Sequence, residues 1–206
     1  NRLVEDLQKQ FEELNGTTNL KTHVIKLLDQ AFVSMKNLDN LSPNEFLKKV
    51  NNFYDFFLPG IINIIKKKDN LHRIAVFYKA NDKELKILHG YGYSPEGKEN
   101  LTLELYKSKA GFCYINNESY FNNDISTDPT FKRNPKSSRR YYSLICVPIN
   151  YGSHVIGVLN MDGLKKDSFH KDDIDYLTYF ANAISPILNK EIKYMNELSQ
   201  KEAIYN

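Results

Sequence analysis

The sequence predicts an α+β fold, in which helices flank a six-stranded antiparallel sheet and further helices extend it at both ends. The first observation is a change in spacing: apolar residues recur every three or four positions before residue 66, alternate in short runs from 71 to 162, and return to helical spacing after 171. The second is the segment 142–180, which contains two apolar strands, a tight turn, a loop and an amphipathic helix. With 206 residues, 41% of them apolar, the chain can bury a sizeable core.

Three helices are predicted before the sheet. The first two are separated by a break at residues 16–19, and a polar break at 37–40 ends the second. The third begins with a capping box, because Ser42 caps it, Pro43 fits the first helical position and Glu45 follows three residues after Ser42. Pro59 should kink or break this helix, and the lysines at 66–68 suit its C-terminus. The apolar stripes consist of Leu3, Leu7, Phe11 and Leu14, then Leu20, Val24, Leu27, Leu28, Ala31 and Met35, and then Phe46, Val50, Phe53, Phe57 and Ile61.

Six short runs are predicted to be strands. The first two form a hairpin across Asn81 and Asp82, and the last two form a hairpin across a turn in which Gly152 supplies a positive φ. A short helix at 108–116, entered through Gly111, and a long loop at 122–140 with one helical turn separate the others. The six runs are 74–78, 85–91, 101–105, 120–121, 142–149 and 155–162.

A final helix is predicted over residues 171–203, with Pro186 bending it locally. Its apolar seam, in steps of three and four, is typical of a coiled coil and comprises Ile174, Leu177, Ala181, Ile184 and Leu188. We expect the first half to cover the sheet and residues 191–203 to contact either a second copy or the N-terminal helix. The predicted organisation is a helical extension at 1–41, a central domain at 42–188 and a C-terminal helix extension at 189–206. A homodimer is expected to form through the terminal helices.

Composition excludes several classes of protein. The net charge of +3 does not by itself indicate a nucleic-acid partner, and no apolar run is long enough to span a membrane. The two cysteines form neither a disulfide framework nor a metal cluster, so we expect the protein to reside in a reducing cytoplasm. This location is compatible with a membrane tether in segments outside this chain. Because the chain begins at Asn1 rather than Met and ends within a helical pattern, we interpret it as part of a longer protein whose output domain lies elsewhere.

Three sequence segments resemble the C-terminal half of a GAF domain, a family of small sensory modules related to PAS domains. They are S-L-I-C-V-P-I, then I-G-V-L-N-M-D, and then the helix entry F-H-K-D-D-I-D-Y-L-T-Y-F-A. The resemblance implies that a small molecule binds between the sheet and a cover made of residues 108–142. It also implies a sensory or dimerising role, since only a minority of the family are enzymes.

The cover contains the main candidate ligand-binding residues. Its segment 121–131 resembles the family's V-x-D-V-x-x-D-P-x-F loop, which places Asp124 and Asp128 at the acidic positions and Phe131 at the aromatic one. Physically, both aspartates can accept hydrogen bonds from backbone N–H groups and hold the loop closed, and direct ligand contact is the alternative role. The full set of candidates is Tyr91, Cys113, Phe121, Asn123, Asp124, Asp128, Phe131, Tyr142 and Ser143.

Cys113 is the one candidate nucleophile. The segment Gly111-Phe112-Cys113 resembles the G-V-C segment of free methionine-R-sulfoxide reductases, which are GAF-fold enzymes. Such an enzyme needs a second thiol to resolve the oxidised product, and the loop that would supply it has no cysteine. Cys146 is predicted to be a small buried apolar residue. We therefore expect no catalysis and keep a thiol-dependent reductase as an alternative.

Other ligand signatures are absent from the sequence. A Cys-His pair for a covalent bilin is missing, because Tyr114 follows Cys113, and the N-K-x-x-x-F-x-x-x-D-E signature of cyclic-nucleotide GAF domains is missing as well. The five histidines do not cluster, so no metal site is predicted, and His170 with Asp173 three residues later is interpreted as a helix cap. The sequence identifies neither a ligand nor a cofactor.

A basic and aromatic run occupies residues 131–142, with five cations at Lys132, Arg133, Lys136, Arg139 and Arg140. Such a run can bind nucleic acid or phosphate, attract an anionic ligand to the pocket mouth, or remain a solvated loop. No other nucleic-acid signature is present, so direct nucleic-acid binding is not expected. The favoured function is a non-catalytic sensory or regulatory domain of a larger bacterial signalling or transcription-regulatory protein. In such a domain, ligand-dependent ordering of the cover would shift the terminal helices. A nucleic-acid-associated regulator is a further alternative function.

Overall fold

The structure is a computed structural model that describes residues 2–38, 40–65, 71–134, 137 and 140–205, except for the side chains of 2–15, 17 and 202–205. The helices are α1 (Arg2–Lys36), α2 (Pro43–Ile65), α3 (Pro95–Asn100), α4 (Lys109–Asn116) and α5 (Asp173–Tyr205), with a 3-10 turn η1 (Ile125–Thr127). The strands are β1 (His72–Lys79), β2 (Glu84–Tyr91), β3 (Thr102–Glu104), β4 (Tyr120–Asn122), β5 (Ser143–Tyr151) and β6 (His154–Gly163).

The six strands form one sheet in the order β3-β2-β1-β6-β5-β4, and every neighbouring pair is antiparallel. This arrangement confirms the predicted fold class, including the two hairpins. The central strands β1, β5 and β6 are buried along most of their length on both faces. They read as nearly continuous apolar runs because both of their faces are covered.

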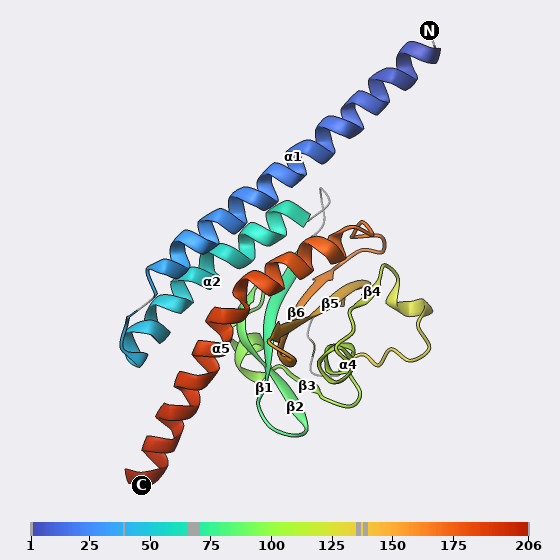
Figure 1. Ribbon diagram of the computed structural model, residues 1–206. Coiled ribbons are helices and arrows are strands. Elements are labelled where there is room, and N and C mark those ends of the chain that lie inside the picture. The colour runs from blue at the N-terminus through green and yellow to red at the C-terminus, as the bar shows by residue number, and fades with distance from the viewer. Residues whose placement is uncertain (1, 39, 66–70, 135–136, 138–139, 206) are drawn as a thin grey trace.

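Helices cover the two faces of the sheet unequally (Figure 1). The long helices α1, α2 and α5 pack on one face, where they share a core with residues such as Val76, Val147 and Leu159. On the other face, α4 and the segments around it pack on a smaller cluster that includes Phe77, Leu85 and Val158. The smaller cluster leaves room for a cavity.

Two predicted helix breaks do not occur. Helix α1 runs without interruption through residues 16–19, because one glycine costs a helix only about 1 kcal/mol and the stretch has no proline. Helix α2 continues past Pro59, where the lost hydrogen bond is offset by buried neighbours on both sides, among them Phe57, Leu58 and Ile61. The lysines at 66–68, which were expected to close this helix, lie outside the described residues.

The second half of α5 contacts more of the domain than its sequence predicted. Tyr194 packs edge-on against Phe46 of α2, with ring centroids 5.3 Å apart. Glu191 lies 2.7 Å from His89 of β2, and both side chains are buried. Residues 191–203 were expected to contact a second copy or the N-terminal helix, and the structure shows that Glu191 and Tyr194 also contact β2 and α2 of their own chain. The predicted cap at His170 is confirmed, since its backbone N–H donates to Asp173 at 2.7 Å.

Candidate functional site

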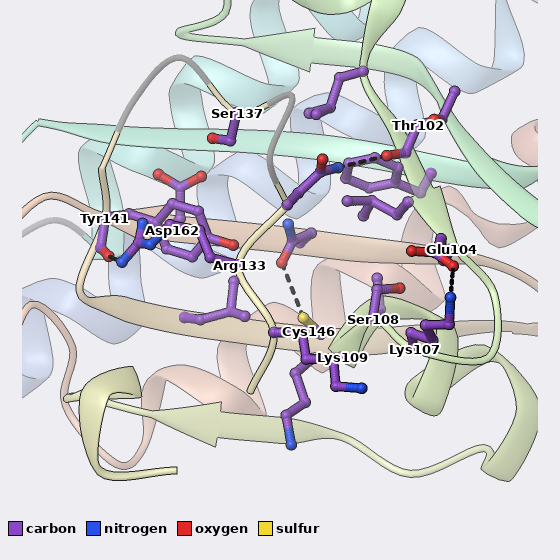
Figure 2. Close-up of a pocket in the computed structure, with 18 of the residues that line it drawn as sticks. Thr102, Glu104, Lys107, Ser108, Lys109, Arg133, Ser137, Tyr141, Cys146 and Asp162 are labelled. Atoms are coloured by element: carbon purple, nitrogen blue, oxygen red, sulfur yellow. Dashed lines mark hydrogen bonds and ion pairs between the residues drawn. The ribbon is translucent and has the colours of Figure 1, made fainter. Parts of the chain in front are cut away.

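A cavity of about 320 Å³ lies between the sheet and the segments that cover its α4 face. Its floor comes from β1, β5 and β6, one wall from β3 and the start of α4, and its roof from residues 131–134, 137 and 141 (Figure 2). The main floor residues are Arg73, Leu144, Cys146, Asn160 and Asp162. Three of them carry polar groups that lie among apolar neighbours.

Arg73 and Asp162 form an ion pair on the floor of the cavity. They face each other across the β1–β6 ladder, with Arg73 Nε 3.1 and 3.0 Å from the two carboxylate oxygens and Nη2 2.7 Å from Oδ2. The residues are 6% and 2% exposed, so the pair is shielded from solvent. Burial alone lowers the pKa of Arg73, but the Asp162 carboxylate opposes this and the net shift is upward. The Arg73 guanidinium therefore stays charged.

Two tyrosine rings surround the Arg73 guanidinium. Its central carbon lies 4.7 Å from the Tyr93 ring centroid and 5.8 Å from that of Tyr141. Burial is the largest cause that raises the pKa of both phenols, so both remain neutral. These rings hold the cation by cation–π attraction and fill the space beside it.

The two cysteines lie next to each other where α4, which carries Cys113, packs on β5, which carries Cys146. Cys146 Sγ is 3.0 Å from Asn160 Oδ1, and Cys113 Sγ is 3.6 Å from the carbonyl oxygen of Cys146. Both are fully buried, which confirms the prediction for Cys146. Burial, followed by the contact with Cys113, raises the pKa of Cys146 well above its ordinary value. Cys146 is consequently a neutral thiol.

Side chains of the cover tie it to the rim of the cavity. Asn134 Nδ2 donates to the carbonyl of Thr102 at 2.6 Å, which joins the cover to β3. Arg133 donates to the carbonyl of Tyr141 at 3.1 Å and lies over its ring. On the wall, the Ser108 hydroxyl caps α4 by accepting from the Gly111 N–H at 3.0 Å. The start of α4 is thus fixed at the cavity wall.

The predicted loop residues hold the cover closed. Asp124 accepts from the Ser126 N–H at 3.2 Å, and Asp128 accepts from the Thr130 N–H at 2.8 Å, which confirms the physical role predicted for both. Asp128 also pairs with Lys109 at 2.7 Å. The contacts with Lys109, Thr130 and Tyr120, in that order, hold the pKa of Asp128 well below its ordinary value.

Among the nine candidate ligand-binding residues, Phe131 lines the cavity. Asn123 and Ser143 instead bond to the connection between β6 and α5: the Asn123 amide pairs with both backbone groups of Phe169, and the Ser143 hydroxyl lies 2.7 Å from the Lys165 carbonyl oxygen. Of the others, Phe121 packs on the helix-side core, Cys113 is buried within α4, Tyr142 is half-buried, and Tyr91 is 48% exposed at the end of β2. Ligand contact by these residues stays a prediction.

The polar floor residues Arg73, Asn160 and Asp162 are absent from the predicted set. Their signal is present in the sequence, because Asn160 and Asp162 alternate with apolar residues in V-L-N-M-D and Arg73 precedes I-A-V-F. Alternation by two places Asn160 and Asp162 on the same sheet face. A charged residue inside an apolar strand is a signal for a buried partner.

Similar folds occur in solved structures. The GAF domain of an Acinetobacter phosphoenolpyruvate-protein phosphotransferase matches with a TM-score of 0.60 and 14% identity, over 82% of this chain and 91% of that one. The GAF domain of the Coxiella burnetii phosphoenolpyruvate-protein phosphotransferase matches with a TM-score of 0.61 and 15% identity, over 86% and 98%. The free methionine-R-sulfoxide reductase of Neisseria meningitidis, in complex with its substrate, matches with a TM-score of 0.54 and 15% identity, over 73% and 90%. At these identities the similarity shows the fold alone.

No curated protein matches this chain in sequence. Among the described helices, none has the length and apolar character needed to cross a membrane. The family model of the GAF domain matches residues 61–189, which span all six strands and the first half of α5. The chain belongs to the GAF domain family.

Proposed function

We propose that this GAF domain is a non-catalytic sensory module that binds a small molecule in the cavity under its cover. The observation that carries the proposal is the polar floor of the cavity, where a buried ion pair and an amide interrupt an apolar core. Burying such groups costs free energy, and an apolar core would be at least as stable. Their presence at the floor of a cavity of about 320 Å³ supports a role in ligand recognition.

The cysteines support a role without catalysis. A sulfoxide reductase needs a thiolate in contact with its substrate, but Cys113 is fully buried between α4 and the sheet and contacts the Cys146 carbonyl oxygen. Cys146 lines the cavity, and burial raises its pKa away from the thiolate form. The reductase alternative therefore rests on the shared fold and on the resemblance of Gly111-Phe112-Cys113 to the reductases' G-V-C segment.

A relay from the cavity to α5 follows from the packing of β6. Its residues Asn160 and Asp162 lie in the cavity floor, whereas Leu159 and Met161, which alternate with them, belong to the core shared with α5. A ligand that moves the floor or orders the cover would shift this strand against α5. GAF domains are commonly sensory, and α5 would transmit occupancy to an output domain by a shift between two packing states.

Native mass spectrometry of the purified chain tests the proposal. Leu101 is a half-buried cavity residue, so Leu101→Trp should plug the cavity and remove any bound small molecule. Leu71→Trp is the matched control, because Leu71 is 66% exposed and lies outside the cavity lining. We expect the wild type and Leu71→Trp to take up a small molecule from a bacterial metabolite extract and Leu101→Trp to lose it. Absence of any bound mass in all three proteins would contradict the proposal.

A further inference from the structure

We infer that the ligand of this cavity is a small organic anion, with one carboxylate group joined to an apolar body of about one ring. The inference rests on the small-molecule binding proposed above and specifies its chemistry. Hydrogen-bond donors on the floor, the start of α4, the charge balance of the lining and the apolar walls each support it.

Two buried donors on the floor have hydrogens to spare. Arg73 uses Nε and Nη2 for Asp162, and its other terminal nitrogen has no acceptor in the described part of the chain. The Asn160 amide oxygen accepts a hydrogen bond from the Cys146 thiol, and the NH₂ group of Asn160 has no acceptor among those same residues. These residues are 6% and 8% exposed. Both residues line the cavity, so a ligand oxygen at the floor would accept hydrogen bonds from both free N–H groups.

Helix α4 adds donors from the wall. It begins at the cavity, which is lined by Ser108, Lys109 and Ala110. The Ser108 hydroxyl accepts a hydrogen bond from the Gly111 N–H, while the N–H groups of Lys109 and Ala110 have no acceptor within the described residues. The start of a helix carries a partial positive charge and favours an anion. Together with the two donors on the floor, this helix start adds N–H groups without acceptors to the cavity lining.

The charge balance of the lining favours a single negative charge. Among the described residues, the basic side chains are Arg73, Lys107, Lys109, Lys132 and Arg133, and the acidic ones are Glu84, Glu104 and Asp162. Lys109 is compensated by Asp128, which lies outside the lining. The surplus among the described lining residues is therefore one positive charge. A surplus of this sign attracts an anion and repels a cation.

A cationic ligand would find its usual aromatic partners occupied. Tyr93 and Tyr141 already hold the Arg73 guanidinium, at 4.7 and 5.8 Å from their ring centroids. The remaining apolar surface is supplied by Phe77, Leu101, Leu103, Phe131 and Leu144. A volume of about 320 Å³ is at the small end of ligand pockets, which suits a ring-sized acid better than a nucleotide.

Three probes of one shape separate the charge classes: 3-phenylpropionate, the neutral 3-phenylpropionamide and the cationic 3-phenylpropylamine. Titration calorimetry on the whole chain should show the acid binding about ten-fold or more tightly than the amide, as expected for hydrogen bonds to a charged group. The amine should not bind. An amide that binds as tightly as the acid, or an amine that binds best, would overturn the inference.

Two variants test whether the ligand carboxylate is recognised by residues on the floor and at the mouth of the cavity. Asn160→Asp exchanges the free NH₂ group for a carboxylate of the same shape, and should weaken binding of the acid about ten-fold or more. Asn196→Asp on the exposed side of α5 is the matched control and should bind like the wild type. Because a buried aspartate can destabilise the fold, Arg133→Gln at the exposed mouth provides a second test. It should weaken the acid several-fold and leave the amide unchanged, and equal losses for both probes would count against an anion site.

Failure of this inference can be distinguished from failure of the proposed function. If none of the probes binds but Leu101→Trp removes a native small molecule, the mass of that molecule decides. An organic acid supports the inference, whereas a neutral or cationic molecule overturns it and leaves the sensory function standing. If no probe binds and no native molecule is found, both are overturned.

Discussion

At Gly111 the absence of a side chain determines where α4 sits. A Cβ atom at this position would collide with the carbonyl oxygen and backbone carbon of Leu105, which belong to the segment between β3 and α4. Neither atom can move without shifting the backbone. This close approach brings the first turn of α4, with Ser108 and Ala110, to the cavity wall. Adding a single methyl group at Gly111 therefore tests whether the position of α4 depends on its close approach to Leu105.

Gly111→Ala should destabilise the domain by about 1–3 kcal/mol, the usual cost of overpacking a tight site. Gly16→Ala is the matched control: Gly16 lies in α1, and a Cβ atom there would meet no atom within 4 Å. It should stabilise the chain by about 0.5–1 kcal/mol, because alanine favours a helix more than glycine does. Urea unfolding monitored by circular dichroism measures both. Equal stabilities for the two variants would mean that α4 can move freely away from Leu105.

At the scale of elements, a buried pair fastens α5 to the sheet. His89 Nε2 in β2 lies 2.7 Å from Glu191 Oε1, and the Tyr54 ring of α2 stacks on the imidazole with centroids 3.8 Å apart. His89 and Glu191 are 8% and 3% exposed, so neither group can exchange its partner for bulk water. The contact lies where α5 passes beyond the predicted sensory domain, and three elements meet there. It is suited to couple the strands to the C-terminal part of α5.

Glu191→Ala should destabilise the domain by about 1–3 kcal/mol, because it leaves the buried His89 imidazole without its hydrogen-bond partner. Lys193→Ala, on the exposed side of the same helix, should cost less than about 0.5 kcal/mol. Amide hydrogen exchange should also increase in α5 after residue 189 in the first variant and not in the second. If Glu191→Ala loses stability without faster exchange in this segment, the pair stabilises the core but does not hold the helix end.

The range of each interaction along the chain explains what could be predicted. The bonds of Asp124 to Ser126 and of Asp128 to Thr130 span two residues, so turn chemistry alone indicated them. The Arg73–Asp162 pair spans 89 residues and depends on the β1–β6 register, which the local sequence pattern does not provide. Tertiary packing likewise overrode the break signal at Pro59 in α2, whereas the break signal in α1 was weak, because one glycine costs a helix little.

Helix α3 was missed for a different reason. Its start repeats the signal read at the third predicted helix, since Ser94 precedes Pro95, and the Ser94 hydroxyl accepts from the Gly97 N–H at 3.1 Å. The helix has six residues, none of them buried, so no apolar stripe accompanies the cap. Apolar periodicity identifies a helix by its buried face, and a short exposed helix lacks this signal.

At the scale of the whole molecule, the two terminal helices leave the domain in opposite directions (Figure 1). Helix α1 carries exposed apolar side chains where it lies on the domain: Ile25, Phe32 and Val33 are 67%, 53% and 54% exposed. Ile25 and Phe32 are one heptad apart, beside the stripe that buries Val24 and Ala31. A continuous exposed stripe of this kind is typical of a protein interface, and a second copy of the chain is the partner that the terminal helices predict.

The chain should therefore form a dimer in which this stripe of α1 is buried. Phe32→Glu places a charge in the stripe and should shift the sedimentation coefficient toward the monomer at micromolar concentration, because a buried unpaired charge opposes association. Phe112→Glu is the matched control, since Phe112 is 41% exposed on α4, across the sheet from α1. Analytical ultracentrifugation over a dilution series measures both. Dissociation by Phe112→Glu instead would move the interface to the α4 face, where it would close over the cavity, and a wild-type monomer at every concentration would rule out a dimer through α1.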